Sequence, residues 1–380
     1  MDDGRSKLVH RPETMPFLSH ELIVWKILVR LPAKSLLQLR CVCKAWRDII
    51  SGADPSFSQA HLYHLHQQVK KPYSLLIAPR IKSESDMEDP RDTRRPWADM
   101  KVTSPGLYLW EESQKDITTL LFDISSFPTD GVATRHGLAH CDGLVLLPAE
   151  DTVHVLNPAT RQIRVLPWSP NGVAPRRCPE GEGHQAFGFG RDHRTNAYKV
   201  ARFFHRETRG IGGLGMEVFT IGKDQCWHDV ANKPCFVLFS LEDETSSVMK
   251  GPPWYQGDNC FDSSLAELNG VLALPRQELN KLVEIWMCDD VQGNKAPRWE
   301  PRHVLDYRFS VRLIAMSDDE IVYQDGSDYL RRHTYQGAKI MVRMNLLEYY
   351  DPNMGMLVGY SRKDVMRFDV MSYIPTLVQI

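Results

Sequence analysis

The most constraining feature of the sequence is a ten-residue run, residues 22–31, that reads L-I-V-W-K-I-L-V-R-L. Its two polar residues, Lys26 and Arg30, are four positions apart and would share one narrow stripe of a helix. A helix that is apolar around most of its circumference must be covered on more than one side. Ser19 is a suitable cap for the start of this helix, and Pro32 predicts its end because proline disfavours helical backbone in the preceding residue.

Two further helices are predicted in the same region. The first covers Ser35–Ile50, because apolar residues recur there at helical spacing. These residues are Leu36, Leu39, Cys43, Trp46 and Ile50. Asp54-Pro55 then resembles an N-cap followed by a proline in the first turn, and predicts a third helix that carries Phe57, Leu65 and Val69.

This helical segment is too small to bury its own apolar side chains. Two or three short helices in about 50 residues form a small core, and each Leu or Ile left in water forfeits about 1.5–3 kcal/mol of burial. We therefore expect the segment to bind a partner surface. Between Ser19 and Ile50 there are six basic residues and two acidic ones, a local charge of +4 (6 − 2), which favours an acidic partner.

The segment Phe17–Ile50 resembles an F-box. The family pattern is approximately L-P-x-E-L, then I-L-x-x-L-P, a leucine-rich turn and V-C-K-x-W, and the chain departs from it at Ser19, where the family usually has proline. The matching residues are Leu18, Glu21, Leu22, Ile27, Leu28, Leu31, Pro32, Leu36, Leu39, Val42, Cys43, Lys44 and Trp46.

The resemblance implies a docking function. F-boxes bind a Skp-type adapter, which joins them to the cullin and RING subunits of a ubiquitin ligase, while the rest of the chain recruits a substrate protein. The adapter-binding residues implied by the resemblance are Leu18, Leu22, Ile27, Leu28, Leu31, Pro32, Leu36, Leu39, Val42, Cys43 and Trp46. The last three lie on a stripe that could mix internal core with interface.

The remaining 309 residues, 72–380, have a different pattern. Short runs rich in β-branched, leucine and aromatic residues alternate with turn residues, so we expect an all-β body. The clearest runs are Tyr73–Ala78, Leu144–Leu147, Val153–Leu156, Tyr198–Phe204, Met216–Ile221, Val271–Leu274, Val283–Met287, Glu320–Gln324 and Ile340–Met344.

A loose repeat runs through this body. Residues 141–148 (C-D-G-L-V-L-L-P) resemble 268–275 (L-N-G-V-L-A-L-P), and 317–323 is a weaker copy. Each copy is a polar turn that leads into an apolar strand. A repeat of roughly 40–50 residues is typical of propeller blades and predicts a β-propeller of about six or seven blades. A pair of antiparallel sandwiches is the alternative.

The body also resembles the associated region of plant F-box proteins. The resemblance depends on short motifs, namely D-G-L-V-L-L (142–147), N-P-A-T-R (157–161), F-G-F-G-R-D (187–192), Y-K-V (198–200), E-V-F (217–219) and W-H-D-V (227–230). It implies a propeller of kelch-like geometry that binds other proteins. The double-glycine signature of kelch repeats is absent from the sequence.

These observations predict the domain organisation of the chain. We expect an α+β multidomain protein with a disordered N-terminus at 1–16, an F-box at 17–57, a helical linker at 58–72 and a substrate-binding propeller at 73–380. The segment 83–105, dense in charge and proline, predicts a mobile loop insertion.

Composition limits the other functions that the chain could have. The 46 basic and 48 acidic residues nearly balance, so nucleic acid is not an expected partner. No apolar run approaches the roughly 20 residues needed to cross a bilayer, and we expect neither a membrane contact nor a secretory signal. The eight cysteines are widely spaced and form no C-x-x-C pair, which favours free thiols in the cytoplasm or nucleus.

No catalytic or metal-binding motif stands out. Residues 210–215 match G-x-G-x-x-G by letter, but a predicted strand follows where the dinucleotide motif needs a helix, so we expect a hairpin loop. His61, His64 and His66 lack acidic or cysteine companions and are expected on a helix surface. We therefore expect no cofactor and no metal.

The sequence thus predicts a non-catalytic substrate-recognition subunit of a Skp–cullin–F-box ubiquitin ligase. It would act by proximity, holding the lysines of an unidentified target near a charged ubiquitin-conjugating enzyme. Two alternatives stay open: an F-box scaffold that does not cause degradation, and a propeller enzyme or ligand binder with a vestigial F-box.

Overall fold

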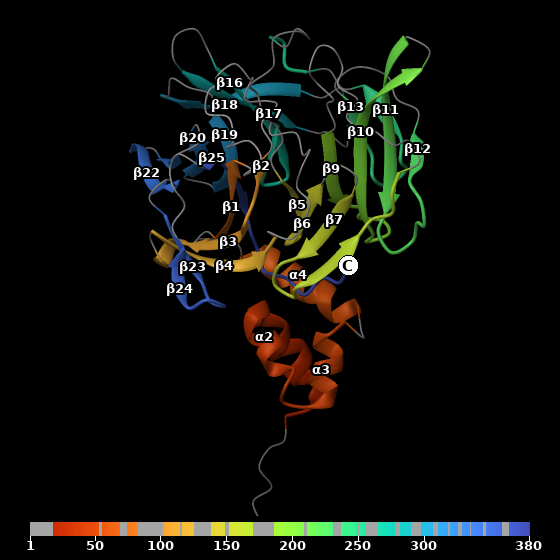
Figure 1. Cartoon of the computed structure of the whole chain (residues 1–380), viewed down its shortest axis with the longest axis vertical. Coiled ribbons are helices and arrows are strands. Elements are labelled where there is room, and N and C mark those ends of the chain that lie inside the picture. The colour runs from red at the N-terminus through yellow and green to blue at the C-terminus, as the bar shows by residue number, and fades with distance from the viewer. Residues whose placement is uncertain are drawn as a thin grey trace, which may run out of the picture. The chain divides into compact units, whose positions relative to one another are not determined.

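The structure of the chain is a computed structural model, and it separates into two compact units, Met1–Gln68 and Val69–Ile380 (Figure 1). The structure describes residues 18–52, 55–68, 74–82, 102–114, 116–124, 138–148, 152–169, 186–208, 211–230, 237–248, 251–254, 265–277, 282–289, 298–306, 311–317, 320–325, 329–334, 336–344, 347–358 and 365–380. Among the helices in these ranges, none has the length and apolar character needed to span a bilayer.

Two predicted segments lie wholly or mostly outside the described residues. They are the N-terminus at 1–16 and the loop insertion at 83–105. At the end of the second segment the structure describes residues 102–105, where Val102–Thr103 form a short strand, β2, that pairs with β1 (Ser74–Lys82).

All regular elements in the described part of the first unit are helical. Its elements are α1 (His20–Leu22), the π-helical turn η1 (Ile23–Ile27), the 3-10 turn η2 (Leu28–Arg30), α2 (Ala33–Leu39), α3 (Lys44–Ile50) and α4 (Pro55–Gln68). The predicted start and end of the first helix are confirmed. The Ser19 hydroxyl accepts a hydrogen bond from the Leu22 amide at 3.3 Å, and the backbone becomes extended at Leu31, before Pro32.

The prediction of one helix over Ser35–Ile50 is wrong. The chain forms two helices there, α2 and α3, separated by a turn at residues 40–42. Cys43 is extended and caps α3, and its sulfur accepts a hydrogen bond from the Trp46 amide at 3.5 Å. The regular spacing of apolar residues across 36–50 concealed this break, because a cysteine is a less recognisable cap than Ser, Thr, Asp or Asn.

The second unit is an all-β propeller (Figure 1). Its largest sheet runs in the order β2-β1-β3-β4-β23-β24, with β25 also paired to β1. Besides β1 and β2, this sheet contains β3 (Gly106–Glu111), β4 (Ile117–Asp123), β23 (Glu348–Asp351), β24 (Met356–Val358) and β25 (Val365–Ser372). The short 3-10 turn η5 (Glu112–Gln114) lies between β3 and β4.

Four further sheets each hold four antiparallel strands in chain order. They are β5 (Ala139–Cys141), β6 (Leu144–Pro148), β7 (Val153–Asn157) and β8 (Gln162–Val165); β9 (Ala186–Arg191), β10 (Tyr198–Thr208), β11 (Ile211–Thr220) and β12 (His228–Val230); β15 (Ala266–Leu268), β16 (Val271–Gln277), β17 (Val283–Asp289) and β18 (Arg298–Leu305); and β19 (Val311–Ser317), β20 (Glu320–Asp325), β21 (Tyr329–Thr334) and β22 (Gly337–Arg343). The hairpin β13 (Val237–Phe239) and β14 (Ser246–Val248) forms a small separate sheet.

The predicted number of six or seven blades is wrong. Within the described ranges, five sheets of at least four strands form five blades, and the β13–β14 hairpin has only two strands. The estimate divided the length of the body by a typical repeat. The chain departs from that average because the largest sheet uses both ends of the body and seven strands. Each of the nine predicted apolar runs coincides with a strand, although Ile221 and Met344 lie one residue beyond the ends of their strands and Tyr73 lies outside the described residues.

Alternating residues of β1 pack against two neighbouring sheets. Leu75 and Ile77 join a core cluster with Val322 and Leu330 of the β19–β22 sheet. Leu76 and Ala78 join a different cluster with residues of the β5–β8 sheet, including Val145. Since successive side chains of a strand point to opposite faces, one strand fills the space between two blades.

The repeated turn of the sequence joins the first two strands of a blade. Asp142 and Gly143 have φ of 50° and 77°, and Asn269 and Gly270 have φ of 53° and 78°. Two successive residues with positive φ are the requirement of a type I′ hairpin turn, in which Asp-Gly and Asn-Gly are favoured.

The two turns differ in their surroundings. A Cβ at Gly143 would lie 2.3 Å from the carbonyl oxygen of Ile374, whereas one at Gly270 would meet nothing within 4 Å. The Thr376 hydroxyl donates to the Asp142 carbonyl at 2.8 Å, and Asn157 Nδ2 donates to the carbonyls of Thr376 and Val378. The β5–β8 sheet therefore holds the C-terminal segment of the chain.

This difference gives a matched pair of substitutions. We expect Gly270→Ala to cost about 1 kcal/mol, the strain of a side chain at positive φ. We expect Gly143→Ala to cost about 2 kcal/mol more, because the C-terminal segment must also move. Thermal unfolding of the two variants measures the difference, and equal falls in Tm would contradict the close packing at Gly143.

Candidate functional site

The candidate site is the apolar surface of the helical unit. The structure separates the eleven predicted adapter-binding residues into three groups by exposure. The exposed residues are Leu18, Leu22, Ile27, Pro32, Val42 and Cys43, the half-buried ones are Leu31, Leu39 and Trp46, and the buried ones are Leu28 and Leu36.

Leu28 and Leu36 fill the interior of the unit. Their side chains are 1% and 0% exposed, and Phe57 of α4 is also fully buried. Their burial indicates that they stabilise the fold of the unit. A substitution at either position would test folding before it tested docking.

The exposed apolar side chains of α1 and η1 form a surface that the sequence pattern could not define. Leu22 and Ile27 are exposed, and so is Trp25, which sequence reasoning missed. The residues between them turn as a π-helix, which has more residues per turn than an α-helix, so a 3.6-residue period does not assign their faces. Since the run is apolar at nearly every position, hydropathy alone does not separate core from surface.

Contacts with α4 fix the end of the first helical segment. The His61 side chain is fully buried and its Nε2 donates to the Leu31 carbonyl at 2.9 Å. The Phe57 ring lies 6.1 Å from the Trp25 ring and 6.4 Å from the imidazole of His61. The expectation that His61 lies on the helix surface is therefore wrong. His64 is half-buried and His66 is exposed.

The basic residues of the unit accompany the apolar surface. Five of them are exposed, namely Lys26, Arg30, Lys34, Lys44 and Arg47. None of the six basic residues between Ser19 and Ile50 forms an ion pair with another described residue. This arrangement provides uncompensated positive charge beside exposed apolar side chains, which suits an acidic partner.

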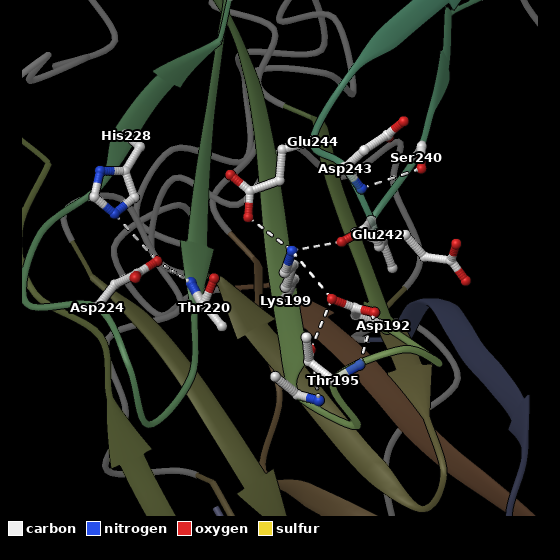
Figure 2. A network of polar contacts seen from close by, with 12 residues as sticks. Asp192, Thr195, Lys199, Thr220, Asp224, His228, Ser240, Glu242, Asp243 and Glu244 are labelled. Carbon is white, nitrogen blue, oxygen red and sulfur yellow. Dashed lines mark hydrogen bonds and ion pairs between the residues drawn. The ribbon is translucent and has the colours of Figure 1, made fainter.

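Figure 2 shows a network of polar contacts in the propeller. Lys199 of β10 lies 2.7 Å from Glu244 Oε1 and 3.4 Å from Asp192 Oδ2. Arg194 donates to the Glu242 carbonyl at 2.7 Å. The network thus joins the turn that follows β9 to the turn between β13 and β14.

The electrostatics of this network favour a structural role. Burial alone would raise the pKa of Asp192, but hydrogen bonds from Thr195, Arg194 and Lys199 outweigh burial and hold that pKa well below its ordinary value. A carboxylate that stays ionised is a poor general acid or base at neutral pH. Burial and the neighbouring Asp142 carboxylate raise the pKa of the Cys141 thiol to about 12, so this thiol stays protonated.

The glycine-rich segment expected as a hairpin loop lies in a strand. Residues 211–215 belong to β11 and pair with β10, and a Cβ at Gly215 would lie 2.7 Å from the Phe204 ring. Gly210 lies outside the described residues. Gly215 allows close packing of the aromatic ring on the sheet, and the strand continues to Thr220 where the dinucleotide motif needs a helix.

Comparison with protein families identifies both units. The F-box domain matches residues 20–56, and the F-box associated beta propeller domain matches residues 96–259. The chain therefore belongs to the plant F-box proteins that carry an F-box-associated propeller domain.

Its relatives include proteins from Arabidopsis thaliana. F-box/kelch-repeat protein At2g43270 is 31% identical over 188 residues, which cover 47% of this chain and 72% of that protein. Putative F-box protein At3g10430 is 26% identical over 187 residues, which cover 48% of this chain and 40% of that protein. A solved structure, AfRom2 CNH domain, is 9% identical, covering 71% of this chain and 85% of that chain, with a TM-score of 0.28 that is too low to bear on the fold.

The buried His61 predicts a pH-dependent stability of the helical unit. Burial lowers the pKa of His61, the hydrogen bond to Leu31 partly offsets this, and His64 lowers the pKa further. The folded state therefore keeps His61 neutral, while an unfolded chain binds a proton as pH falls through about 6.5. Stability is full above that pH and is lost below it.

We expect the helical signal in circular dichroism to melt at a lower temperature at about pH 5.5 than at about pH 7.5. His61→Leu should reduce this pH dependence, because leucine does not titrate. His66→Gln alters an exposed histidine and is the matched control. An unchanged pH dependence in His61→Leu would show that other groups cause the effect.

Proposed function

We propose that the chain is the substrate-recognition subunit of a Skp–cullin–F-box ubiquitin ligase. The observation that carries the proposal is the set of large apolar side chains that stay exposed on the F-box. They are Leu18, Leu22, Trp25, Ile27 and Val42. Together with Pro32 and Cys43 they are the proposed contact surface for a Skp-type adapter.

Burial of this surface supplies the driving force for docking. Fully burying a large aliphatic side chain stabilises by about 1.5–3 kcal/mol, so a side chain that is half-exposed retains roughly half of that gain for a partner. The half-buried Leu31, Leu39 and Trp46 would form the border between this surface and the core. The uncompensated basic residues favour an adapter with an acidic contact face.

The propeller has a different role in this proposal. It binds a target protein, while the adapter links the chain to the cullin and RING subunits. The chain forms no bond itself and acts by raising the local concentration of target lysines near the charged conjugating enzyme. This role places the protein in the cytoplasm or the nucleus, where the ligase works.

The adapter contact predicts a clear pattern in co-purification. We expect Leu22→Asp and Ile27→Asp, made in the full chain, each to reduce the amount of Skp-type adapter that co-purifies by at least about tenfold, because a charge replaces a desolvated apolar contact. Tyr63→Asp is the matched control, since Tyr63 is an exposed residue of α4 outside the proposed surface.

The same samples need a test of folding. Thermal unfolding of the variants should stay close to that of the wild type, because the substituted side chains are exposed. Adapter binding that survives both substitutions in folded protein would contradict the proposed surface.

A further inference from the structure

The outer strand of one propeller blade, β8, has an open edge. β8 is the last strand in the order β5-β6-β7-β8 and pairs with β7 alone among the described strands. The Leu166 amide donates to the Val153 carbonyl at 2.8 Å, which marks these two residues as a hydrogen-bonded pair. In an antiparallel ladder such pairs alternate. Val155↔Arg164 and Asn157↔Gln162 are therefore also hydrogen-bonded pairs.

The main-chain groups of Ile163 and Val165 consequently point away from β7. Each offers one N–H and one C=O to whatever lies beside the open edge. Their side chains share one face of the sheet and are 47% and 56% exposed. Arg164 points to the opposite face. The edge thus combines free main-chain hydrogen-bonding groups with apolar side chains.

An exposed tryptophan follows this strand on a fixed backbone. Trp168 is 64% exposed, although both of its neighbours are held by buried partners. The Pro167 carbonyl accepts from Trp227 Nε1 at 2.8 Å, and the Ser169 hydroxyl donates to Glu217 Oε2 at 2.8 Å. A large aromatic ring presented to solvent on a rigid backbone is a typical anchor of protein recognition.

The positive charge beside this edge favours an acidic partner. Arg161 and Arg164 make no ion pair with any described residue, and β8 has no acidic residue. In an added strand, side chains alternate between the two faces, so apolar residues would lie beside Ile163 and Val165 while the residues between them face Arg164. Acidic residues in those positions would complement the arginine.

Three of the other sheets have outer edges that differ from the edge of β8. In the largest sheet, β23 adds to the edge of β4 as a parallel strand, with Glu348 opposite Ile117. This pairing shows that an outer edge of this propeller accepts an added strand. The outer strand β18 contains Pro301, and β22 contains Lys339, both of which discourage pairing. β8 has neither residue type.

We propose that the edge made by β8 and Trp168 binds an extended segment of a target protein, with alternating apolar and acidic residues, as an additional β-strand. The inference rests on the proposed receptor function only in assigning this segment to a ubiquitination target. The strand supplies main-chain hydrogen bonds, Ile163 and Val165 supply apolar contact, and Trp168 supplies the anchor.

The proposal is tested with a fluorescein-labelled heptapeptide of alternating valine and glutamate and with the full chain. We expect fluorescence anisotropy to show at least about tenfold tighter binding of this peptide than of its valine–lysine counterpart, since lysine would face Arg164. The two peptides share length and alternation and differ only in charge. Equal affinities, or no binding of the glutamate peptide, would overturn the proposal.

Substitutions then locate the binding site. Ile163→Pro removes an N–H that points away from β7 and leaves the β7–β8 hydrogen bonds in place. We expect this variant, Trp168→Ala and Val165→Glu each to weaken binding by at least about fivefold. Val304→Glu makes the same chemical change as Val165→Glu at a half-exposed residue of β18 and should leave binding unchanged.

Two further measurements separate the outcomes. Co-purification of the Skp-type adapter should be unchanged in all four variants. Failure of the peptide test would therefore not contradict the proposed adapter contact, and failure of the adapter test would not contradict peptide binding at β8. Sedimentation of the chain alone tests whether a second copy occupies the edge. Concentration-dependent self-association that Ile163→Pro abolishes, without peptide binding, would overturn the proposal in favour of a homodimer.

Discussion

The pairing of the first strand of the body with its last is the constraint on which the propeller depends. β1 and β25 pair from Leu75↔Ser372 to Ile81↔Val365, residues almost 300 positions apart in sequence. Inside this pairing, Arg80 Nε lies 2.7 Å from Asp369 Oδ2, and both side chains are 1% exposed. Removing one partner of a buried ion pair costs about 3–5 kcal/mol because the other charge is left buried and unpaired, so Arg80 and Asp369 depend on each other once the two strands are paired. Arg312 of β19 lies 3.8 Å from the same carboxylate and extends the contact to the neighbouring blade.

Closure of the propeller brings the strands nearest the centre into contact with neighbouring sheets, whereas the outer strands keep an unpaired edge. Contacts between β5 and β9, between β15 and β19 and between β19 and β25 link the first or last strands of successive sheets. Among the described strands, the outermost strand of each four-stranded sheet pairs on one side only. Each such edge must be protected against unwanted pairing with another strand, because its main-chain N–H and C=O groups are unpaired and lie beside apolar side chains. Pro301, Lys339 and the added strand β23 protect three of these outer edges in different ways, and β8 has none of these features.

The sequence predicted the features that depend on local chemistry. It did not predict the features that depend on the packing of distant segments. The cap at Ser19, the helix end before Pro32 and the nine apolar runs in strands each follow from a few adjacent residues. The number of blades depends on which distant strands share a sheet, and no local pattern encodes the pairing of β1 with β25. The exposed surface of the F-box was hidden for a related reason. In a run as apolar as residues 22–31, exposure is decided by the π-helical turn and by α4, so the sequence pattern did not distinguish the exposed Trp25 from the buried Leu28.

The two proposed surfaces would recognise their partners by different physical means. On the F-box, side chains such as Leu22 and Ile27 would provide most of the contact, so recognition would depend on the shape of a folded acidic surface. At β8, much of the contact would come from main-chain hydrogen bonds. Such bonds require an extended partner with alternating side chains and depend less on the identity of each residue. An edge of two outward residues and one tryptophan buries less area than a standard stable interface. Such an interface favours short-lived complexes, which would suit the proposed receptor function, in which one modified target leaves before the next one binds.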